Sequence, residues 1–245
     1  MRYPTFVLFV VAACGSSGNN NPKVDAGPDA KIWMDAPPSV PAMITISGTA
    51  VEQGQNTNTP LPGVKVAVFK RSNESTPLGM ATSDAQGKYS IQVTTGGMVV
   101  DGYVKATISG HPDSYAFPAI PWQADDTSAD PQMITQSNYD QLSLFILSRQ
   151  AGQGLVIVNV TDASGHGVAG ASIATSPASP HYAYMDPSSG IPNASLTMTA
   201  TDGIAFAAGM APGEVMLNAT KSGSTFKSHA LNIHADAFTT TSITE

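Results

Sequence analysis

The chain has 245 residues, of which 42% are hydrophobic and only 12% are charged. That length allows one large or two ordinary cores, since domains usually run about 100 to 200 residues. The 22 glycines and 18 prolines indicate a turn-rich, all-β, exported protein. A formal net charge of −7 excludes a basic groove for nucleic acid, which needs clustered Lys and Arg. The single cysteine excludes an internal disulfide framework and a metal site built from several thiolates.

Residues 1–13 predict a secretion signal. Their apolar stretch follows the lone basic residue Arg2 and is too short to cross about 30 Å of hydrocarbon as a helix. No later stretch approaches the roughly 18 to 20 continuous apolar residues of a membrane-spanning helix. We therefore expect the rest of the chain to be exported and water-soluble.

The signal ends in the sequence Val-Ala-Ala-Cys-Gly, with the cysteine at position 14. This resembles the bacterial lipobox, in which an aliphatic residue and two small residues precede the lipidated cysteine. The resemblance implies that the Cys14 thiol receives a diacylglyceryl group and that Cys14 becomes the new N-terminus. Loss of Arg2 then leaves a formal side-chain charge of 10 − 18 = −8. An ordinary signal peptide with an incidental cysteine is the alternative.

Lipidation would make the membrane the first partner of this chain. Two or more acyl chains hold a protein stably on a bilayer, whereas one holds it only marginally. Gly15 stands where, in enteric bacteria, an aspartate favours retention in the inner membrane. The expected location is therefore the bacterial cell envelope, at the outer membrane.

Residues 14–41 predict a disordered linker after the lipidated cysteine. The segment is rich in Gly, Ser, Asn, Asp and Pro, and it cannot bury enough apolar surface to offset the entropy of ordering. The 27 residues from 15 to 41 would reach roughly 30 Å as a random coil, or about 80 Å if extended. That reach is enough to lift a domain off the lipid headgroups.

Residues 42–136 predict an antiparallel β-sandwich, because apolar residues recur at every second position, as in half-buried strands. Turn sequences separate the strands. Pro62-Gly63 presets one φ and frees another, and residues 84–87 (Asp-Ala-Gln-Gly) place glycine where a left-handed residue closes a hairpin. In one strand the alternation puts Tyr103, Lys105 and Thr107 on the solvent side. The residues expected to face the core are Val64, Val66, Val68, Tyr89, Ile91, Val93, Val104, Ala106 and Ile108.

Residues 154–245 repeat this pattern and predict a second sandwich. The offsets between corresponding residues are unequal, which predicts an insertion in the second copy. We place the insertion at residues 176–196, with residues 182–185 as a short edge strand. The expected fold class is all-β, with two antiparallel Ig-like sandwiches in tandem. The corresponding pairs are Gly63 with Gly170 (offset 107), Asp84 with Asp202 (offset 118) and Gly102 with Gly213 (offset 111).

Two sequence runs carry a family resemblance. Residues 60–66 (PLPGVKV) followed by residues 82–90 (TSDAQGKYS) are similar to the carboxypeptidase regulatory-like domain. Residues 167–171 (GVAGA) and 211–213 (APG) resemble a more divergent member of the same family. The resemblance covers most of residues 43–245 and implies two transthyretin-like sandwiches. It concerns turn geometry and core alternation, so it implies a fold and no particular activity.

Residues 137–153 predict a short helix that connects the two modules. Asn138 offers an N-cap, and Gln141 stands three residues later, as in a capping box. We expect its apolar face to pack at the junction of the modules. A closing strand of the first module is the alternative.

Five histidines are scattered over predicted loops and strand ends. No pair has the helical i, i+4 spacing and the glutamate that zinc proteases use. His229 and His234 are five residues apart on a predicted strand, so they should face opposite sides. Surface positions are expected for His111, His166 and His181 as well. Since no nucleophile elbow, phosphate loop or dinucleotide fingerprint is visible either, we expect no enzyme activity, no cofactor and no metal.

The densest acidic cluster in the folded part is formed by Asp125, Asp126 and Asp130. Carboxylate oxygens from one loop could hold a calcium ion. A solvated loop without metal is the favoured alternative.

Two carboxylates stand near tyrosines in turn-rich loops, Asp113 near Tyr115 and Asp186 near Tyr184. Exposed aromatic rings beside carboxylates would suit the stacking of sugars. Core packing is the competing explanation, because aromatic residues make up only 7% of the chain.

Two chemistries of related folds find little support in the sequence. Hydroxyisourate hydrolase ends in Tyr-Arg-Gly-Ser, whereas residues 241–245 here are Thr-Ser-Ile-Thr-Glu. Pilin-type relatives form a bond between a lysine and an asparagine, for which Lys65, Lys70 and Asn138 are the candidates. The glutamate signature of those proteins near the last strand is missing.

The leading hypothesis is therefore a non-catalytic envelope lipoprotein that displays two sandwich modules for a structural or protein-interaction role. Edge strands or loops would meet another envelope protein. A carbohydrate-binding module that faces peptidoglycan or exopolysaccharide is the second hypothesis. A hydrolytic enzyme is the third and weakest.

Overall fold

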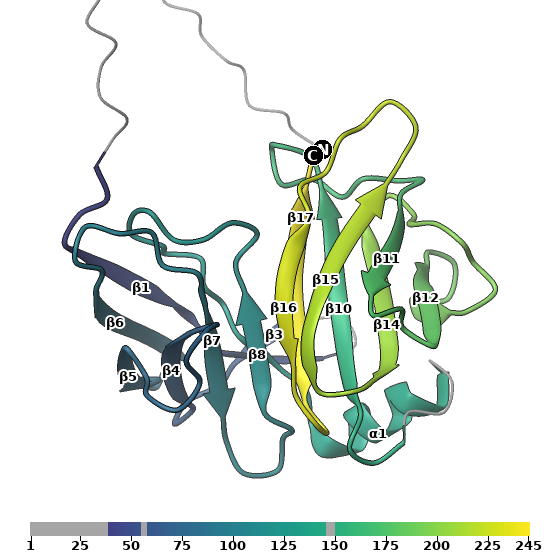
Figure 1. Cartoon of the computed structure of the whole chain (residues 1–245). Helices are drawn as coiled ribbons and strands as arrows, with labels where there is room; N and C mark the ends of the chain where they lie inside the picture. The colour runs from purple at the N-terminus through teal and green to yellow at the C-terminus, as the bar shows by residue number, and fades with distance from the viewer. Residues whose placement is uncertain (1–38, 55–57, 146–149) are drawn as a thin grey trace, which may run out of the picture. The chain divides into compact units, whose positions relative to one another are not determined.

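The computed structural model describes residues 39–54, 58–145 and 150–245 (Figure 1). The predicted signal peptide, Cys14 and the predicted linker up to residue 38 lie outside the described residues. The described chain is mostly β-strand with one short helix, which confirms the predicted fold class.

The first module packs two layers of strands against each other. Its strands, within the described residues, are β1 (Met43–Thr49), β2 (Val51–Gln53), β3 (Asn58–Pro60), β4 (Lys65–Lys70), β5 (Gly79–Thr82), β6 (Lys88–Thr94), β7 (Gly102–Thr107), β8 (Ser114–Phe117) and β9 (Gln132–Met133). One layer pairs β1 with β6, and β2 with β3 and β9. The other layer has the order β8, β7, β4, β5.

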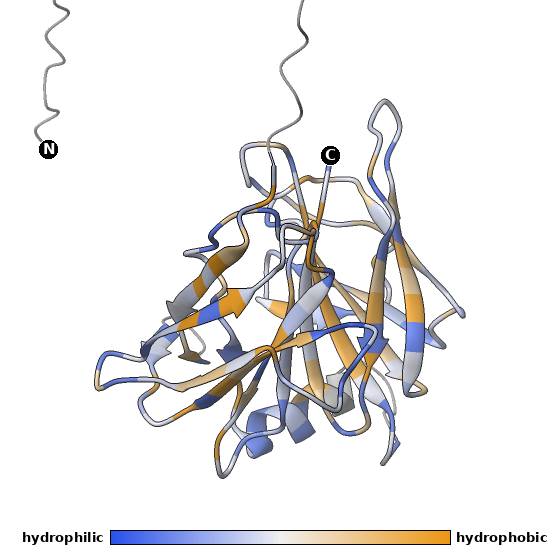
Figure 2. Cartoon of the chain, turned by 60° about the vertical axis from the view of Figure 1, so that its left-hand side comes forward, coloured by the Kyte–Doolittle hydropathy of each residue, from blue (hydrophilic) through white to orange (hydrophobic). Residues whose placement is uncertain are grey.

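The core of the first module confirms the predicted alternation. β6 alternates strictly between exposed and buried residues, because successive side chains of a pleated strand point to opposite faces. Figure 2 shows the apolar residues as bands along the strands. All the predicted inward residues are buried except Ile108, which packs partly buried against the same cluster.

The predicted turns of the first module are also confirmed. Gly63 and Gly87 have φ angles of +77° and +73°, the left-handed region in which glycine is favoured. The Asp84 carboxylate accepts hydrogen bonds from the backbone N–H groups of Gln86 and Lys88, at 2.9 and 2.8 Å. The side chain of Asp84 thus closes the hairpin that Gly87 permits.

The second module repeats the two-layer arrangement. Its strands, within the described residues, are β10 (Gly154–Thr161), β11 (Ser172–Ser176), β12 (His181–Asp186), β13 (Ile191–Asn193), β14 (Ile204–Met210), β15 (Gly213–Thr220), β16 (His229–Ile233) and β17 (Phe238–Thr244). One layer has the order β11, β15, β16, and the other has the order β13, β12, β14, β10, β17. In both modules the layers are therefore antiparallel except at the pairs β2–β9 and β10–β17.

The predicted insertion at residues 176–196 contains the whole hairpin of β12 and β13. The strand predicted at residues 182–185 is present, but it is not at the edge, because β13 pairs outside it. The hydroxyls of Tyr184 and Tyr182 accept hydrogen bonds from the backbone N–H groups of Ile173 and Thr175, at 3.1 and 2.9 Å. The insertion thus satisfies part of the open edge of β11.

A buried hydroxyl group fastens the turn before β4 in the first module. The Ser83 hydroxyl donates to the carbonyl oxygen of Leu61 at 2.8 Å and accepts from the backbone N–H of Val64 at 2.9 Å. The backbone of Ser83 also pairs with Gly63 and Val64. We call this arrangement the hydroxyl clamp.

The second module has the same hydroxyl clamp before β11. The Thr199 hydroxyl donates to the carbonyl oxygen of Val168 at 2.6 Å and accepts from the backbone N–H of Ala171 at 3.0 Å. The turn glycines that follow, Gly87 and Gly203, are both left-handed. The internal repeat read from the sequence therefore extends to individual hydrogen bonds.

One helix, α1 (Gln136–Phe145), connects the modules and is shorter than the predicted 137–153. Residues 146–149 lie outside the described part, and residues 150–153 form a turn in which Gly152 has a φ of +84°. The N-cap is Thr135 instead of Asn138, since the Thr135 hydroxyl accepts from the N–H of Asn138. Tyr139 is fully buried, and its hydroxyl donates to the carbonyl of Ala237. The helix thus packs against the second module, whereas its apolar face was expected at the junction of the two modules.

The two modules share a single nine-stranded sheet. Its order is β13, β12, β14, β10, β17, β8, β7, β4, β5. The connection is a parallel pairing of β17 with β8, in which residues 238–241 lie opposite residues 114–117. The Thr241 hydroxyl adds a hydrogen bond of 3.2 Å to the carbonyl of Phe117. Backbone hydrogen bonds therefore run without interruption from one module into the other.

Candidate functional site

The outer face of β4, β7 and β8 carries an aromatic cluster, formed by Phe69, Tyr103, Tyr115 and Phe117. The Tyr103 ring lies at its centre, with ring centroids 5.7 Å from Phe69, 5.7 Å from Tyr115 and 4.8 Å from Phe117. Tyr103 is only 1% exposed and packs with the core of the second module. The prediction that Tyr103 faces solvent was wrong, because the second module covers this face.

Glu74, in the loop between β4 and β5, accepts three hydrogen bonds, two of which come from the second module. Its Oε1 accepts from the Tyr103 hydroxyl at 3.0 Å, from Asn232 Nδ2 at 2.7 Å and from His234 Nε2 at 3.1 Å. Burial raises the pKa of Glu74, but the hydrogen bonds from Asn232, Tyr103 and His234 and the nearby charge of His234 lower its pKa more, so that the net shift is downward. Asn232 Nδ2 also donates to the carbonyl of Arg71 at 2.9 Å.

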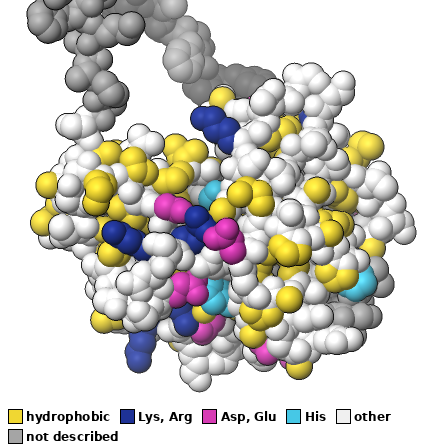
Figure 3. Space-filling view, in the orientation of Figure 1, with side chains coloured by type: hydrophobic (Ala, Val, Ile, Leu, Met, Phe, Trp, Pro, Cys, Tyr) yellow, Lys and Arg dark blue, Asp and Glu magenta, His cyan; other side chains and the backbone are white. Residues whose placement is uncertain are grey.

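Arg71 adds an ion pair on each side of the junction. Its guanidinium lies 2.9 Å from Asp101 Oδ2 in the first module and 2.5 Å from Glu214 Oε2 in the second. The hydrogen bond to Asp101 is the main cause of the raised pKa of Arg71. Figure 3 shows acidic, basic and histidine side chains gathered near the middle of this face.

His229 and His234 both lie against the aromatic cluster. The His234 ring stacks on Tyr115 with centroids 3.7 Å apart and an interplanar angle of 6°, and the His229 ring meets Phe117 edge-on at 6.3 Å. Tyr115 and Phe117 are on the same face of β8. The prediction of opposite faces and surface positions was wrong, because β16 ends at Ile233 and His234 lies outside the strand, just before the turn at residues 235–236.

Burial governs the charge of these two histidines. It lowers the pKa of His229 and the pKa of His234 from the ordinary value of 6.5. His229 Nε2 and His234 Nδ1 are buried and have no hydrogen-bond partner within the described residues. Burial thus favours the neutral form of both rings.

The other histidines divide between surface and interior. His166 is exposed, as predicted, and lies 3.5 Å from Asp162. His111 is half-buried, with its Nε2 2.7 Å from Glu52 Oε2. His181 is also partly buried. No group of three or more His, Cys, Asp or Glu residues in the described chain is arranged to hold a metal ion.

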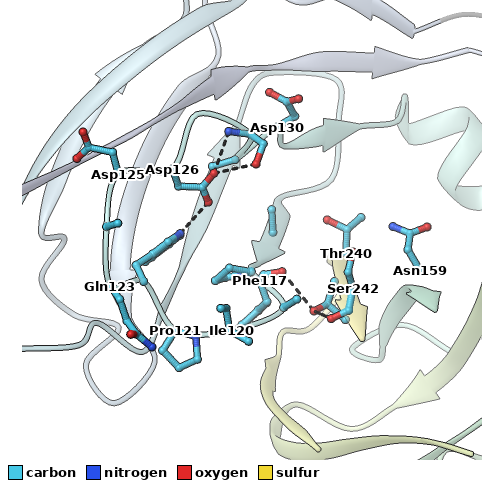
Figure 4. Close-up of a pocket in the computed structure, with 18 of the residues that line it drawn as sticks. Phe117, Ile120, Pro121, Gln123, Asp125, Asp126, Asp130, Asn159, Thr240 and Ser242 are labelled. Carbon is cyan, nitrogen blue, oxygen red and sulfur yellow. Dashed lines mark hydrogen bonds between the residues drawn. The ribbon is translucent and has the colours of Figure 1, made fainter. Parts of the chain in front are cut away.

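A groove of about 690 Å³ lies between the loop after β8 and the strands β10 and β17 (Figure 4). It includes the predicted acidic cluster, and the structure assigns a structural contact to each carboxylate. Asp125 accepts from the N–H of Thr45 at 2.8 Å, and Asp130 from the N–H of Thr49 at 2.5 Å. The groove is lined by residues 116–126, 128–130, 132, 159 and 240–242.

Asp126 holds the loop itself together. Its Oδ1 accepts from the N–H and the hydroxyl of Ser128, at 2.8 and 2.9 Å, and its Oδ2 accepts from Trp122 Nε1 at 2.9 Å. The backbone of Asp126 pairs with Thr45 and Ser47 of β1. The carboxylates of Asp125 and Asp130 thus fasten the loop to β1, and the exposed positions of both residues agree with the predicted solvated loop.

The tyrosines considered for sugar stacking are both buried. Tyr115 lies under His234, and Lys105 Nζ, which pairs with Asp113 at 2.8 Å, lies 5.3 Å from the Tyr115 ring. The Tyr184 hydroxyl is bonded to β11. The predicted combination of an exposed ring and a carboxylate is therefore wrong at both places.

The residues considered for an isopeptide bond have no hydrogen bond or ion pair to one another. Lys65 is exposed on β4, Lys70 ends the same strand half-buried, and Asn138 is exposed on α1.

Among the described residues, no helix is long and apolar enough to span a bilayer.

Sequence reasoning missed Arg71, Glu74 and Asn232, because polar residues in loops and at strand ends are ordinary surface positions. One signal was present. Gly102, Tyr103 and Val104 are consecutive residues without charge, and consecutive apolar residues in a strand indicate burial on both faces.

No family model matches the sequence, and no curated protein matches it. Distant similarity is found to solved structures. The TIE protein of Bacillus anthracis is 11% identical with a TM-score of 0.25, over 81% of this chain and 33% of that one. The shaft pilin SpaA of Lactobacillus rhamnosus GG is 10% identical with a TM-score of 0.25, over 83% and 97%. The minor pilin GBS52 of Streptococcus agalactiae is 12% identical with a TM-score of 0.25, over 82% and 96%. The chain spans about a third of the length of the Bacillus protein.

Proposed function

We propose that this chain is a non-catalytic display protein of the bacterial cell envelope. Its two sandwiches act as one stiff body, held at the membrane by a lipid on Cys14. The observation that carries the proposal is the nine-stranded sheet that passes through both modules. A continuous sheet that side-chain contacts brace at the junction resists bending between modules, whereas modules joined only by a linker move independently.

The junction adds side-chain contacts to the continuous sheet. Glu74, Asn232 and Arg71 connect the β4–β5 loop to β15 and β16, and the aromatic cluster fills the space between them. The polar groups at the junction and the acidic cluster in the loop after β8 both make structural contacts of this kind. Because these polar groups make structural contacts, they support a structural role for the protein.

The anchor is the second part of the proposal. The lipobox-like sequence places a diacylated cysteine at the start of the mature chain, and residues 15–38 separate it from the described body. Outer-membrane placement follows from Gly15. The partner would be another envelope protein. The glycan alternative loses its motivation, since the tyrosines that suggested it are buried.

The anchor can be tested with Cys14→Ser. We expect this variant to move from the membrane fraction to the soluble fraction and to lose incorporation of radiolabelled palmitate. Ser16→Ala is the matched control, because it changes a neighbouring small residue and leaves the thiol. Unchanged membrane partitioning of Cys14→Ser would refute the anchor.

A further inference from the structure

We propose that the junction of the two modules is an acid-sensitive latch, in which protonation of His229 and His234 releases β16 from the aromatic cluster on β7 and β8. The inference rests on the proposed function, since it concerns how the stiff body is regulated. The latch consists of His229, His234 and the aromatic cluster.

The neutral ring of His234 can be protonated only at Nδ1, which has no hydrogen-bond acceptor beside it. Its side chain is 20% exposed, and its Nε2 is 3.1 Å from Glu74 Oε1. In the neutral ring, Nε2–H donates to Glu74, and Nδ1 carries no proton. Nδ1 is buried without a partner. Protonation would therefore create a buried N–H donor at Nδ1 that has no acceptor.

His229, at the beginning of β16, also has a ring nitrogen that cannot be protonated without loss. Its Nε2 is buried without a partner, and its ring lies edge-on to Phe117. On the strand side, His229 is opposite Leu217 of β15, which is fully buried and offers no acceptor side chain. A positive charge there has no compensating hydrogen bond.

The charged groups around the histidines are of both signs. Glu74 and Asp113 face His234 and favour its charged form, whereas Lys105 opposes it. Asp101 favours the charged form of His229, and Arg71 opposes it. In both cases burial has the largest effect, so the pKa in the folded protein is below the ordinary value. A histidine with a lowered pKa stabilises the fold above pH 6.5, and this stability is lost as the pH falls below 6.5.

The pairing of β17 with β8 would survive the release and serve as a hinge. It consists of backbone hydrogen bonds between residues 238–241 and 114–117, none of which has an acidic, basic or histidine side chain. Acid should therefore let the modules rotate about these two strands, and the aromatic cluster would become accessible to water.

The test is a distance measurement between spin labels on the two modules. Labels are attached at Lys88→Cys on β6 and Ala174→Cys on β11, both exposed positions, in a full chain whose only native cysteine is replaced by Cys14→Ser. We expect one narrow distance distribution at pH 7.5 and a broader distribution, or a second population, at pH 5.0. In the same chain with His229→Phe and His234→Phe the distribution should stay narrow at pH 5.0. His166→Phe, at an exposed position, should respond to acid like the parent chain.

The outcomes separate the two proposals. A broad distribution at both pH values would contradict the stiff body itself. A narrow distribution at both values in the parent chain would overturn the latch and leave the stiff body standing. An acid response that persists in the double phenylalanine variant would also overturn the latch. If that variant does not fold, NMR titration of the histidine rings in the parent chain decides: both midpoints must lie below pH 6.5, and midpoints at or above it overturn the latch.

Discussion

β7 of the first module and β15 of the second occupy the same place in the repeat, yet they meet different surroundings. Each begins at a glycine and pairs with the strand that follows the hydroxyl clamp. Tyr103 on β7 is opposite Phe69, and Met216 on β15 is opposite Ser176. Tyr103 is 1% exposed, whereas Met216 is 38% exposed. Equivalent strands can thus have one or two buried faces, and the difference depends on a module more than a hundred residues away.

The largest expected effect comes from shortening Tyr103 and Met216, which are related by their register opposite Phe69 and Ser176. Tyr103→Ala should lower the free energy of unfolding by about 3–5 kcal/mol, because a buried ring and its hydrogen bond to Glu74 are removed. Met216→Ala should cost less than about 0.5 kcal/mol, as is usual for a surface position. Urea denaturation followed by circular dichroism measures both. Equal costs for the two variants would mean that the junction does not cover β7.

The hydroxyl clamps should show the opposite result, an equal cost in the two modules. Ser83→Ala and Thr199→Val each leave a buried N–H and a buried carbonyl without their partner, at an expected cost of about 1–3 kcal/mol. The same urea denaturation measures the change. Ser90→Ala on the exposed face of β6 is the control and should be nearly neutral. If removing the clamp hydroxyl from one module has no cost, the two turns do not contribute equally to stability.

The smallest effect is expected at the exposed ion pair. Glu214→Gln removes one of the two carboxylates on Arg71, and the Glu214 side chain is 67% exposed. We expect a cost of less than about 1 kcal/mol that shrinks further in high salt, because solvent and ions screen such pairs. Denaturation midpoints at low and high ionic strength provide the measurement. A large, salt-independent cost would show that this pair, and not the aromatic cluster, holds the modules together.

Much of the fold could be predicted from local pattern. The alternation in β6 and the Asp84–Gly87 turn are decided by neighbours within a few residues, and both were correct. The insertion was predictable from unequal offsets, although the pairing of β13 outside β12 was not. The predicted end of the helix at residue 153 was wrong, because residues 150–153 form a turn in which Gly152 has a left-handed φ.

The junction could not be predicted in the same way, because its contacts join distant parts of the sequence. Glu74 and Asn232 are 158 residues apart, and nothing in either neighbourhood indicates the other. The contacts of the loop carboxylates could not be predicted for a similar reason, since Asp125 and Asp130 contact β1 some 80 residues earlier. The sequence showed that these residues are hydrogen-bond acceptors, but it did not show which distant backbone groups they accept from.

The parallel pairing of β17 with β8 also affects how the chain is made. β8 is synthesised well over a hundred residues before β17, so its outer edge has no strand beside it while the rest of the chain emerges. An unpaired edge is a template for association with other chains. A product truncated after α1 would keep that edge permanently open, and for this reason we expect such a fragment to self-associate where the intact chain does not.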